Sequence, residues 1–354
     1  MSREQRVQAW PQGWVQRAAH VTDADRVAEL LNARSQKLYG TAYSSPSDVL
    51  AWWEKPGLDL ATDLRLVLDG RGSVAGLVSI ADDGAPHVSF DCSASVHPRY
   101  EADARLWDTL LSWSLERAME RVTRAPRDVC VTAVAQAAAQ DEARRAALER
   151  AGFAPVRVQS HMRIELTEAA AVTPDWPAGV AVRTADLATD LPAIVGLWLE
   201  AWRDHWGFVE RPYADALATF VAGIESRCGP VDPTLWFLAV AGDEGRDVAG
   251  MSLCVSGLPG DPTGGYICDL GVRPEWRRRG VALALLRHTF SEFRRRGFMA
   301  AELDVDAESL TGALRLYERA GLRVIRQELN YEKVLRPGKD LATRELPAAA
   351  RDQH

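Results

Sequence analysis

The stretch DLGVRPEWRRRGVALALL, residues 269–286, joins an apolar run to an amphipathic run through an arginine-rich turn. Residues 266–272 have the pattern of a strand, which Pro274 ends, and residues 279–296 have the apolar period of a helix. Gly280 stands where that helix would begin. A glycine-bearing turn from strand to helix exposes backbone N–H groups at the positive end of the helix dipole. The stretch therefore predicts a binding site for a phosphate or pyrophosphate.

Composition narrows the class of protein. The chain has 354 residues, 47% hydrophobic and 26% charged, which is typical of a globular protein with room for two domains. No apolar run reaches the ~20 residues of a membrane span, and residues 1–14 lack the apolar core of a signal peptide. The five cysteines are scattered without a CxxC or a His/Cys cluster. We therefore expect a cytoplasmic protein with no metal and no membrane partner; its oligomeric state is left open.

The charge distribution indicates a discrete anionic ligand. The net charge is −7, whereas a general nucleic-acid binder needs an extended basic face, so we expect no nucleic-acid partner. Arg277, Arg278 and Arg279 nevertheless crowd the turn. The arginines at 294–296 end the following helix, and interaction with its dipole accounts for them. Only the first cluster is interpreted as part of a binding site.

The order of predicted strands and helices occurs twice along the chain, which indicates two related α/β domains. The predicted parts are a leader at 1–14, a first domain at 15–166, a linker at 167–179, a second domain at 180–335 and a flexible tail at 336–354. The copies also share residues. Residues 92–107 align without a gap on 268–283, with these matches: Cys92/Cys268, Val96/Val272, Pro98/Pro274 and Tyr100/Trp276, followed later by LERAGF (148–153) and YERAGL (317–322).

The second copy resembles the GNAT superfamily of acyl-CoA-dependent N-acyltransferases. The motifs that carry the resemblance are Val272-x-Pro274, Arg277-x-x-Gly280-x-Ala282 and Ala313-x-x-Leu316-Tyr317-Glu318-x-x-Gly321. The resemblance covers residues 180–335 closely and 15–166 by element order only. It implies tandem domains of mixed, mostly antiparallel sheet flanked by helices.

The activity that the resemblance implies is N-acetylation. The donor would be acetyl-CoA, and the acceptor a primary amine of a small molecule or peptide. The tandem arrangement resembles that of mycothiol synthase and related actinobacterial acetyltransferases, which implies an amino-sugar thiol conjugate as an alternative acceptor. A second alternative is a regulatory protein that binds acyl-CoA without turnover.

The resemblance also implies the residues that would bind the cofactor. The backbone from Arg278 to Ala282 would hold the pyrophosphate, with Gly280 permitting close approach. Pantetheine would lie beside a strand that a bulge separates from its neighbour. Gly271 indicates such a bulge or a close approach of backbone, with simple packing as the alternative. The full predicted set is Leu270, Gly271, Val272, Arg277, Arg278, Arg279, Gly280, Val281, Ala282 and Ser309.

For the catalytic groups, the resemblance implies one general acid but leaves several candidates for the general base. Tyr317 stands where the family has its general acid, and a phenol with pKa ~10 can protonate a thiolate; a tyrosine capping a core helix is the alternative. The glutamate that many members use as a base falls at Tyr266. Asp269 is the nearest carboxylate on that strand, and Asp304 and Asp306 on the next strand are rivals, as is a base acting through water.

The first copy lacks the implied machinery. Glu101 stands where the second copy has Arg277, and its negative charge would repel a pyrophosphate. Ala104 replaces the turn glycine, Leu106 replaces Ala282, and Leu148 occupies the tyrosine position. We therefore expect the first copy to be non-catalytic.

The acceptor site is predicted near AWRDHWGFVERPY, residues 201–213, in the first two helices of the second copy. Trp202, His205 and Trp206 stand there among carboxylates, a composition that suits an aminated ligand through cation–π and ion-pair contacts. A helix end with core tryptophans and a solvated charged rim is the alternative, and a lone histidine at a helix end is more often a cap.

Overall fold

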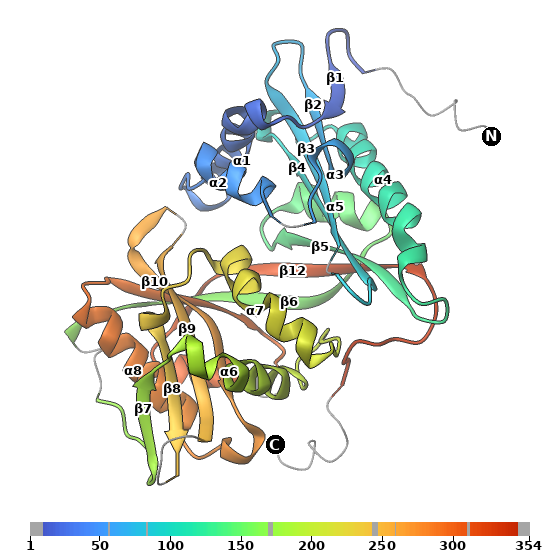
Figure 1. Ribbon diagram of the computed structural model, residues 1–354. Helices are drawn as coiled ribbons and strands as arrows, with labels where there is room; N and C mark the ends of the chain where they lie inside the picture. Colours follow the sequence, from blue (N-terminus) through green and yellow to red (C-terminus); the bar gives the residue numbers. More distant parts are fainter. Residues whose placement is uncertain are drawn as a thin grey trace. The chain divides into compact units, whose positions relative to one another are not determined.

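The computed structural model describes residues 10–55, 57–82, 84–168, 173–242, 247–258, 260–309 and 312–345 (Figure 1). The chain divides into two compact units. The first unit comprises Met1–Val156 with Leu329–Asp340, and the second comprises Arg157–Glu328 with Leu341–His354. Among the described residues, no helix combines the length and the apolar character that crossing a membrane requires.

The first unit is a mixed sheet with helices packed on it. Its strands are β1 (Val15–Ala18), β2 (Leu64–Leu68), β3 (Val74–Asp82), β4 (Ser89–Val96) and β5 (Val131–Ala138), followed by the end of β12 (Arg323–Arg336), neighbours in that order. Its helices are α1 (Ala24–Tyr39), α2 (Pro46–Trp53), the short α3 (Leu60–Asp63), α4 (Ala104–Arg121) and α5 (Glu142–Arg150). Strands β1 to β4 pair antiparallel, and β4 pairs parallel to β5. Apolar side chains of α1 and α2 form a core against β2 and β3.

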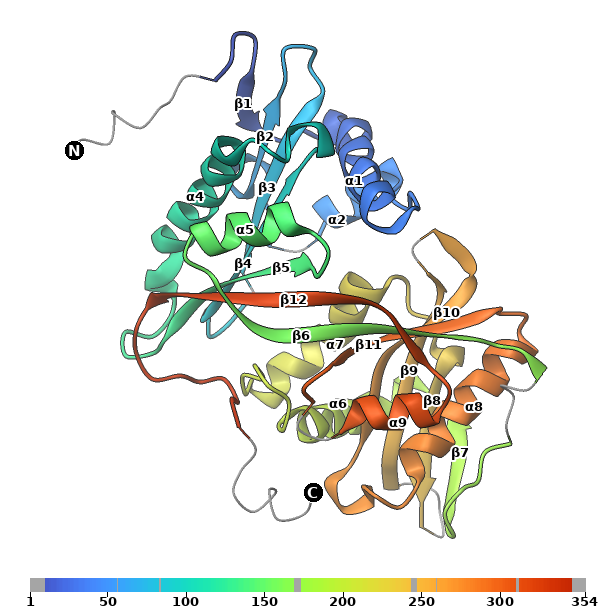
Figure 2. The same ribbon diagram turned by 180° about the vertical axis from the view of Figure 1, so that it is seen from behind.

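The second unit repeats this arrangement. Its strand order is β6 (Ala154–Glu165), β11 (Ala300–Asp306), β10 (Asp261–Val272), β9 (Asp247–Leu258), β8 (Trp236–Ala241) and β7 (Val180–Thr184). Helices α6 (Leu187–Trp202) and α7 (Tyr213–Cys228) cover one face in Figure 1, while Figure 2 shows α8 (Val281–Arg295) and α9 (Ala313–Arg319) over the other. Separate apolar cores fill the two faces. The predicted fold, mostly antiparallel sheets flanked by helices in two related domains, is confirmed.

The last strand of each sequence copy is divided between the units. Strand β6 ends the first copy, yet from Arg157 it belongs to the second unit, where it pairs antiparallel with β11 from Ala300↔Glu165 to Asp306↔Gln159. Strand β12 ends the second copy, yet from Leu329 it belongs to the first unit. The compact units therefore differ from the repeats at 15–166 and 180–335. Apolar alternation indicates a strand but not the sheet that the strand joins.

Residues of the predicted linker and tail also contact the second unit. A tail is predicted from residue 336, but Thr343 N–H donates to the Phe208 carbonyl at 2.9 Å and Gly207 N–H donates to the Thr343 carbonyl at 2.7 Å. Within the predicted linker, Trp176 packs against an apolar cluster that includes Leu285 of α8. Residues 1–9 of the leader, 169–172 of the linker and 346–354 of the tail lie outside the described residues.

Candidate active site

Strands β10 and β11 diverge in the middle of the second unit. They pair parallel over three positions only, from Gly264↔Ala300 to Tyr266↔Glu302. Beyond that point β10 remains paired with β9 as far as Val272↔Gly250, while β11 remains paired with β6. Unpaired strand edges with free backbone groups can bind an extended ligand as an added strand. The divergence therefore suits a pantetheine chain beside Leu270 and Val272.

A β-bulge lies at the start of the divergence. The register of β10 against β9 shifts between Ile267 and Asp269, so Cys268 is the extra residue. As a result Cys268 and Asp269 both face helices α6 and α7: Cys268 packs on the core of that face, and Asp269 accepts a hydrogen bond from Trp198 Nε1 at 3.3 Å. Ile267 faces the opposite core. The bulge thus places a carboxylate on the helix α6 side.

Gly271 does not mark the bulge. A Cβ at this position would lie 3.0 Å from the ring of Trp202 and 3.1 Å from a methyl group of Leu197, both on α6. The missing side chain therefore serves the packing of α6 on β10, which is the alternative interpretation of this glycine. Its backbone remains on the strand that borders the opening.

The turn before α8 presents backbone N–H groups with little steric obstruction. Arg278 and Gly280 have positive φ angles of 62° and 90°, and no side chain caps the helix. The first backbone bond runs from Ala284 N–H to the Gly280 carbonyl at 3.0 Å, which leaves the amides of Val281 and Ala282 at the positive end of the helix. A Cβ at Gly280 would meet nothing within 4 Å. A turn with alternating left-handed residues and an uncapped helix start is a concave site for an anion.

The arginine side chains of this turn have separate surroundings. Arg277 Nη1 forms an ion pair with Asp204 Oδ2 at 2.6 Å, and its Nε donates to the Val272 carbonyl at 3.3 Å. The Arg277 guanidinium therefore ties the turn to the segment that follows α6. Arg279 stacks over Trp276 with 5.1 Å from Cζ to the ring centroid. The side chains of Arg278 and Arg279 are exposed, as a phosphate contact requires.

Tyr317 on α9 lies in the core between α8, α9 and the sheet, with 8% of its surface exposed. Burial raises the pKa of Tyr317, and the negative charge of Asp269 raises it further. The phenol is therefore protonated at neutral pH, which is the form that a general acid needs. Ser309 lies in the turn before α9, where its N–H donates to the Asp306 carbonyl at 2.9 Å.

The predicted acceptor residues separate into two groups. Trp202 stacks on Trp198 at 5.6 Å and on His205 at 5.1 Å between ring centroids. Burial lowers the pKa of His205. Trp206 instead has Arg157 and Arg344 against its ring, at 5.2 Å and 4.4 Å from the centroid. The first group adjoins Asp269 through Trp198, whereas arginines already contact the ring of Trp206.

Two site features escaped the sequence analysis. Trp198 was not singled out, although its spacing of four residues from Trp202 on a predicted helix would have placed both rings on one face. His161 was missed as well. It contacts both Asp304 and Glu302, but it belongs to the first sequence copy, and no local pattern connects it to residues 141 and 143 positions away.

The first unit carries the corresponding elements in altered form. Strands β4 and β5 also pair over three positions, from Ser89↔Thr132 to Asp91↔Val134, but β4 has no register shift against β3. Helix α4 begins at a capping residue, Asp103, whose carboxylate accepts from Arg105 N–H at 3.0 Å. A carboxylate thus occupies the helix start that an anionic ligand would need.

Ion pairs line the cavity beside that helix start. The cavity has a volume of about 400 Å³ and includes Arg34, Lys37, Glu101 and Asp141. Arg34 is buried, pairs with Asp141 and donates to the Val96 carbonyl at 2.7 Å, while Lys37 pairs with Glu101. These four charged side chains of the cavity therefore pair with one another.

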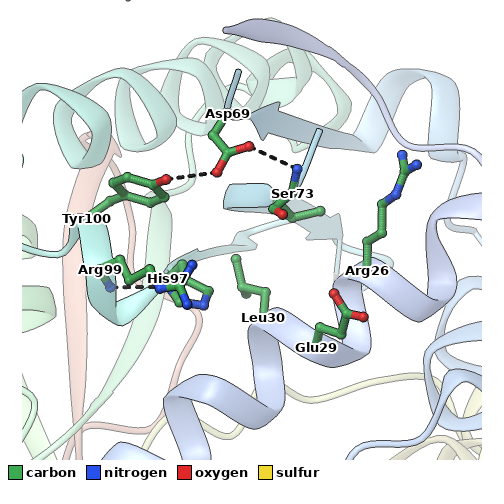
Figure 3. A pocket seen from close by; sticks show the side chains of 9 residues that line it. Arg26, Glu29, Leu30, Asp69, Ser73, His97, Arg99 and Tyr100 are labelled. Atoms are coloured by element: carbon green, nitrogen blue, oxygen red, sulfur yellow. Dashed lines mark hydrogen bonds between the residues drawn. The ribbon is translucent and has the colours of Figure 1, made fainter. Parts of the chain in front are cut away.

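A smaller cavity of about 170 Å³ lies on the other side of the same turn (Figure 3). In it Tyr100 Oη donates to Asp69 Oδ2 at 2.8 Å, and Ser73 N–H donates to Asp69 Oδ1 at 3.0 Å. Tyr100, which aligns with Trp276, therefore anchors the turn of the first copy to the β2–β3 hairpin. In the described part of the chain, no cluster of His, Cys, Asp and Glu side chains is arranged to hold a metal ion.

Comparison with known proteins agrees with this geometry. The sequence profile of the Acetyltransferase (GNAT) family matches residues 193–322. A GCN5-related N-acetyltransferase from Sphaerobacter thermophilus is similar in structure, with 32% identity, a TM-score of 0.79 and coverage of 94% of this chain and 99% of that one. A tandem GNAT protein from the clavulanic acid biosynthesis pathway shares the fold at 16% identity and a TM-score of 0.65, covering 92% and 100%. A comparison with curated protein sequences gives no match.

Proposed function

This chain belongs to the GNAT family of acetyltransferases, and we propose that it moves an acetyl group from acetyl-CoA to a primary amine of a small molecule or peptide. The observation that carries the proposal is the combination of the divergence after Tyr266 with the uncapped start of α8. Pantetheine needs an open strand edge and pyrophosphate needs an uncapped helix start. Both features lie on one continuous segment, residues 267–280, which runs from the end of β10 through the turn to the start of α8.

Acetyl-CoA binding follows from the backbone of this segment. Leu270, Gly271 and Val272 provide the strand edge for the pantetheine amides. The amides from Arg278 to Ala282 point at the pyrophosphate, and the side chains of Arg278 and Arg279 add positive charge in solvent. Arg277 acts mainly through Asp204, since that ion pair holds the turn against the segment after α6. Ser309, in the turn that follows β11, would contribute its hydroxyl to the bound acetyl-CoA.

The chemical step is direct attack of the amine on the thioester. Tyr317 donates a proton to the departing CoA thiolate, and its raised pKa keeps that proton available up to alkaline pH. The charge of Asp269 contributes to that raised pKa, so this carboxylate is in the neighbourhood of Tyr317. Asp269 is the base that the sequence favours, with Asp304 as its rival.

The acceptor would approach from the α6–α7 side. Trp198 and Trp202 offer stacked rings there, and the carboxylate of Asp269 adjoins them. Aromatic faces beside a carboxylate attract an ammonium group. Trp206 is a weaker candidate because Arg157 and Arg344 pack on its ring.

A screen for CoA release tests the proposal. The purified chain, with acetyl-CoA, would be offered polyamines, aminoglycosides, amino sugars and peptides, and free thiol would be measured with time. We expect one class of amine to give turnover that depends on both substrates. Tight binding of acetyl-CoA without turnover on any amine would contradict the proposal and favour a regulatory protein that binds acyl-CoA.

A further inference from the structure

A network of polar side chains joins three strands of the second unit. Tyr266 Oη donates to Asp304 Oδ2 at 2.7 Å, and Asp304 Oδ1 lies 2.7 Å from His161 Nδ1. His161 Nε2 lies 2.5 Å from Glu302 Oε2, and Arg163 donates to Glu302 Oε1 at 2.7 Å. His161 is 4% exposed and Glu302 is 6% exposed, whereas the Asp304 side chain is 35% exposed. The network therefore leads from a buried pair to one accessible carboxylate.

The network lies where β10 and β11 diverge. Tyr266 and Glu302 form the last parallel pair, and Asp304 stands two residues further along β11 on the same face. The hydroxyl of Tyr266 thus spans the beginning of the opening. On this face of β10, Cys268 packs against the core of α6 and α7, whereas Tyr317 lies in the core of the opposite face. The accessible carboxylate and the general acid therefore flank the opening from opposite faces of the sheet.

His161 reaches this place because β6 lies in the second unit. In the pairing of β6 with β11, His161 stands opposite Asp304, and Arg163 stands opposite Glu302. Cross-strand neighbours on one face are close enough for direct side-chain contact. The first sequence copy, which lacks its own turn glycine and tyrosine, thereby contributes a histidine to the network.

The charges of the network keep Asp304 ionised. Burial alone would raise the pKa of Asp304, but His161 and the Tyr266 hydroxyl lower it overall, with a further contribution from Arg326 of β12. Burial alone would lower the pKa of His161, but its hydrogen bonds to Asp304 and Glu302 raise it overall. A carboxylate held between a phenol and an imidazole ring is fixed in orientation and remains an acceptor at neutral pH.

We propose that Asp304 accepts the proton of the attacking amine, and that Tyr266 and His161 are positioning residues that orient its carboxylate. This inference rests on the proposed function. The ammonium group first loses a proton to solvent; the neutral amine nitrogen then forms a bond to the thioester carbon, and its N–H proton goes to Asp304. The carbon–sulfur bond breaks, its electron pair goes to sulfur, and sulfur takes the proton of Tyr317. Solvent then returns the proton from Asp304 to Tyr317.

A carboxylate suffices for this step because the nitrogen becomes much more acidic as it bonds to the carbonyl carbon. Asp269 is less suited to the role. It is 2% exposed and accepts a hydrogen bond from Trp198, so an incoming amine reaches Asp304 more readily. Acid and base on opposite faces also separate the entry of the amine, on the α6–α7 side, from the departure of the thiol, on the α9 side.

Steady-state kinetics of Asp304→Asn test the inference, with the fastest amine of the screen as acceptor. We expect kcat to fall about 100-fold, the usual loss when a general base is removed, with unchanged affinity for acetyl-CoA. Glu308→Gln is the matched control, since Glu308 is an exposed carboxylate just after the same strand and pairs with Arg157 at 2.7 Å. This control should retain the wild-type kcat, and Asp269→Asn should lose less than Asp304→Asn.

The pH profile of Tyr266→Phe separates positioning from a structural role. Loss of the hydroxyl removes a donor that lowers the pKa of Asp304, so that pKa rises. Because the base must be ionised, the acid limb of kcat/KM should move to higher pH, and His161→Asn should move it in the same direction. Circular dichroism and acetyl-CoA affinity would show that each variant is folded.

Two results separate this inference from the proposed function. Wild-type turnover combined with full kcat in Asp304→Asn, or an unmoved acid limb in Tyr266→Phe, would overturn the inference and leave the acetyltransferase proposal intact. Absence of wild-type turnover on every amine would overturn both.

Discussion

The two copies differ most at the start of the helix that follows the shared proline. In the second copy α8 begins after Gly280 with no capping side chain, and Arg278 adopts a left-handed backbone. In the first copy α4 begins after Asp103, whose carboxylate caps it. The start of α8 has no capping side chain, and the start of α4 is capped by a carboxylate of its own chain. Capping a helix and binding a phosphate use the same backbone amides, so a helix start serves one purpose or the other.

A second difference concerns the arginine that donates a hydrogen bond to the last carbonyl of the strand before this helix, which is β4 in the first copy and β10 in the second. In the first copy a buried arginine of α1, Arg34, donates to Val96 and pairs with Asp141 across the opening. In the second copy Arg277 donates to Val272 from the turn itself and pairs with Asp204 after α6. The first arrangement places a buried ion pair beside the ends of β4 and β5, while the second ties the turn to the segment after α6. We therefore propose that internal ion pairs stand in the first copy where the second copy has its ligand site.

Arg34→Ala should have the largest effect, on stability. It leaves Asp141 buried without its partner, which costs about 3 kcal/mol, or roughly 6–12 °C in the melting temperature. Arg277→Ala is the matched variant of the second copy. Its ion pair is more exposed, with side-chain fractions of 28% and 16%, so its loss should cost about 1 kcal/mol or less. Differential scanning calorimetry would measure both, and equal losses would contradict the difference drawn between the two ion pairs.

The double substitution Arg279→Asp with Gly280→Ala gives the second copy the residues of the first. We expect the affinity for acetyl-CoA to fall about 100-fold, or about 2.7 kcal/mol, because the new carboxylate caps α8 and repels the pyrophosphate. Isothermal titration calorimetry would measure the change. The reverse substitution, Asp103→Arg with Ala104→Gly, should create no second site, because Arg34 and Asp141 still occupy the opening. An unchanged affinity for acetyl-CoA in Arg279→Asp with Gly280→Ala would contradict the difference drawn between the two helix starts.

Tyr317→Phe should reduce kcat by about 30- to 100-fold while acetyl-CoA affinity stays the same, because only the proton of the acid is lost. Tyr100→Phe, in the first copy, is the control; its hydroxyl holds the β2–β3 hairpin and should not affect turnover. Steady-state rates and titration calorimetry would separate the two effects. Full turnover in Tyr317→Phe would remove this residue from the proposed mechanism.

Gly271→Ala should have the smallest effect. The added Cβ lies 3.0 Å from the Trp202 ring, so α6 must shift, at a cost of about 1 kcal/mol. We expect a modest rise in KM for the amine, since Trp202 belongs to the aromatic group that would bind it. Ser95→Gly, at the aligned position of the first copy, is the control. A change in acetyl-CoA affinity alone would instead point to a backbone role for Gly271.

Local patterns accounted for the parts of the site that lie on one continuous segment. Gly280 and the turn arginines were predicted because a strand end, a glycine and a helix period identify them without knowledge of distant contacts, whereas Tyr317 was predicted from the family resemblance. Gly271 was a weaker guide, because an absent Cβ can serve either a bulge or the packing of a helix. The bulge lies at Cys268, where no residue type marks it.

Local patterns could not predict contacts between segments that are far apart in the sequence. His161 and Asp304 are 143 residues apart in the sequence, and they meet because β6 pairs with β11. The repeat at 15–166 suggested that β6 would close the sheet of the first copy. Which sheet a strand joins depends on the partners that each sheet edge leaves open, and alternation along the strand carries no information about this.

A structure of the chain with acetyl-CoA tests the central claim most directly. The account predicts one molecule per chain, with pantetheine between β10 and β11 and pyrophosphate on the amides from Arg278 to Ala282. Its thioester should lie between Tyr317 and the α6–α7 face. Electron density for acetyl-CoA at residues 100–106 of the first copy, or at both helix starts, would contradict the division between a binding copy and a self-capped one.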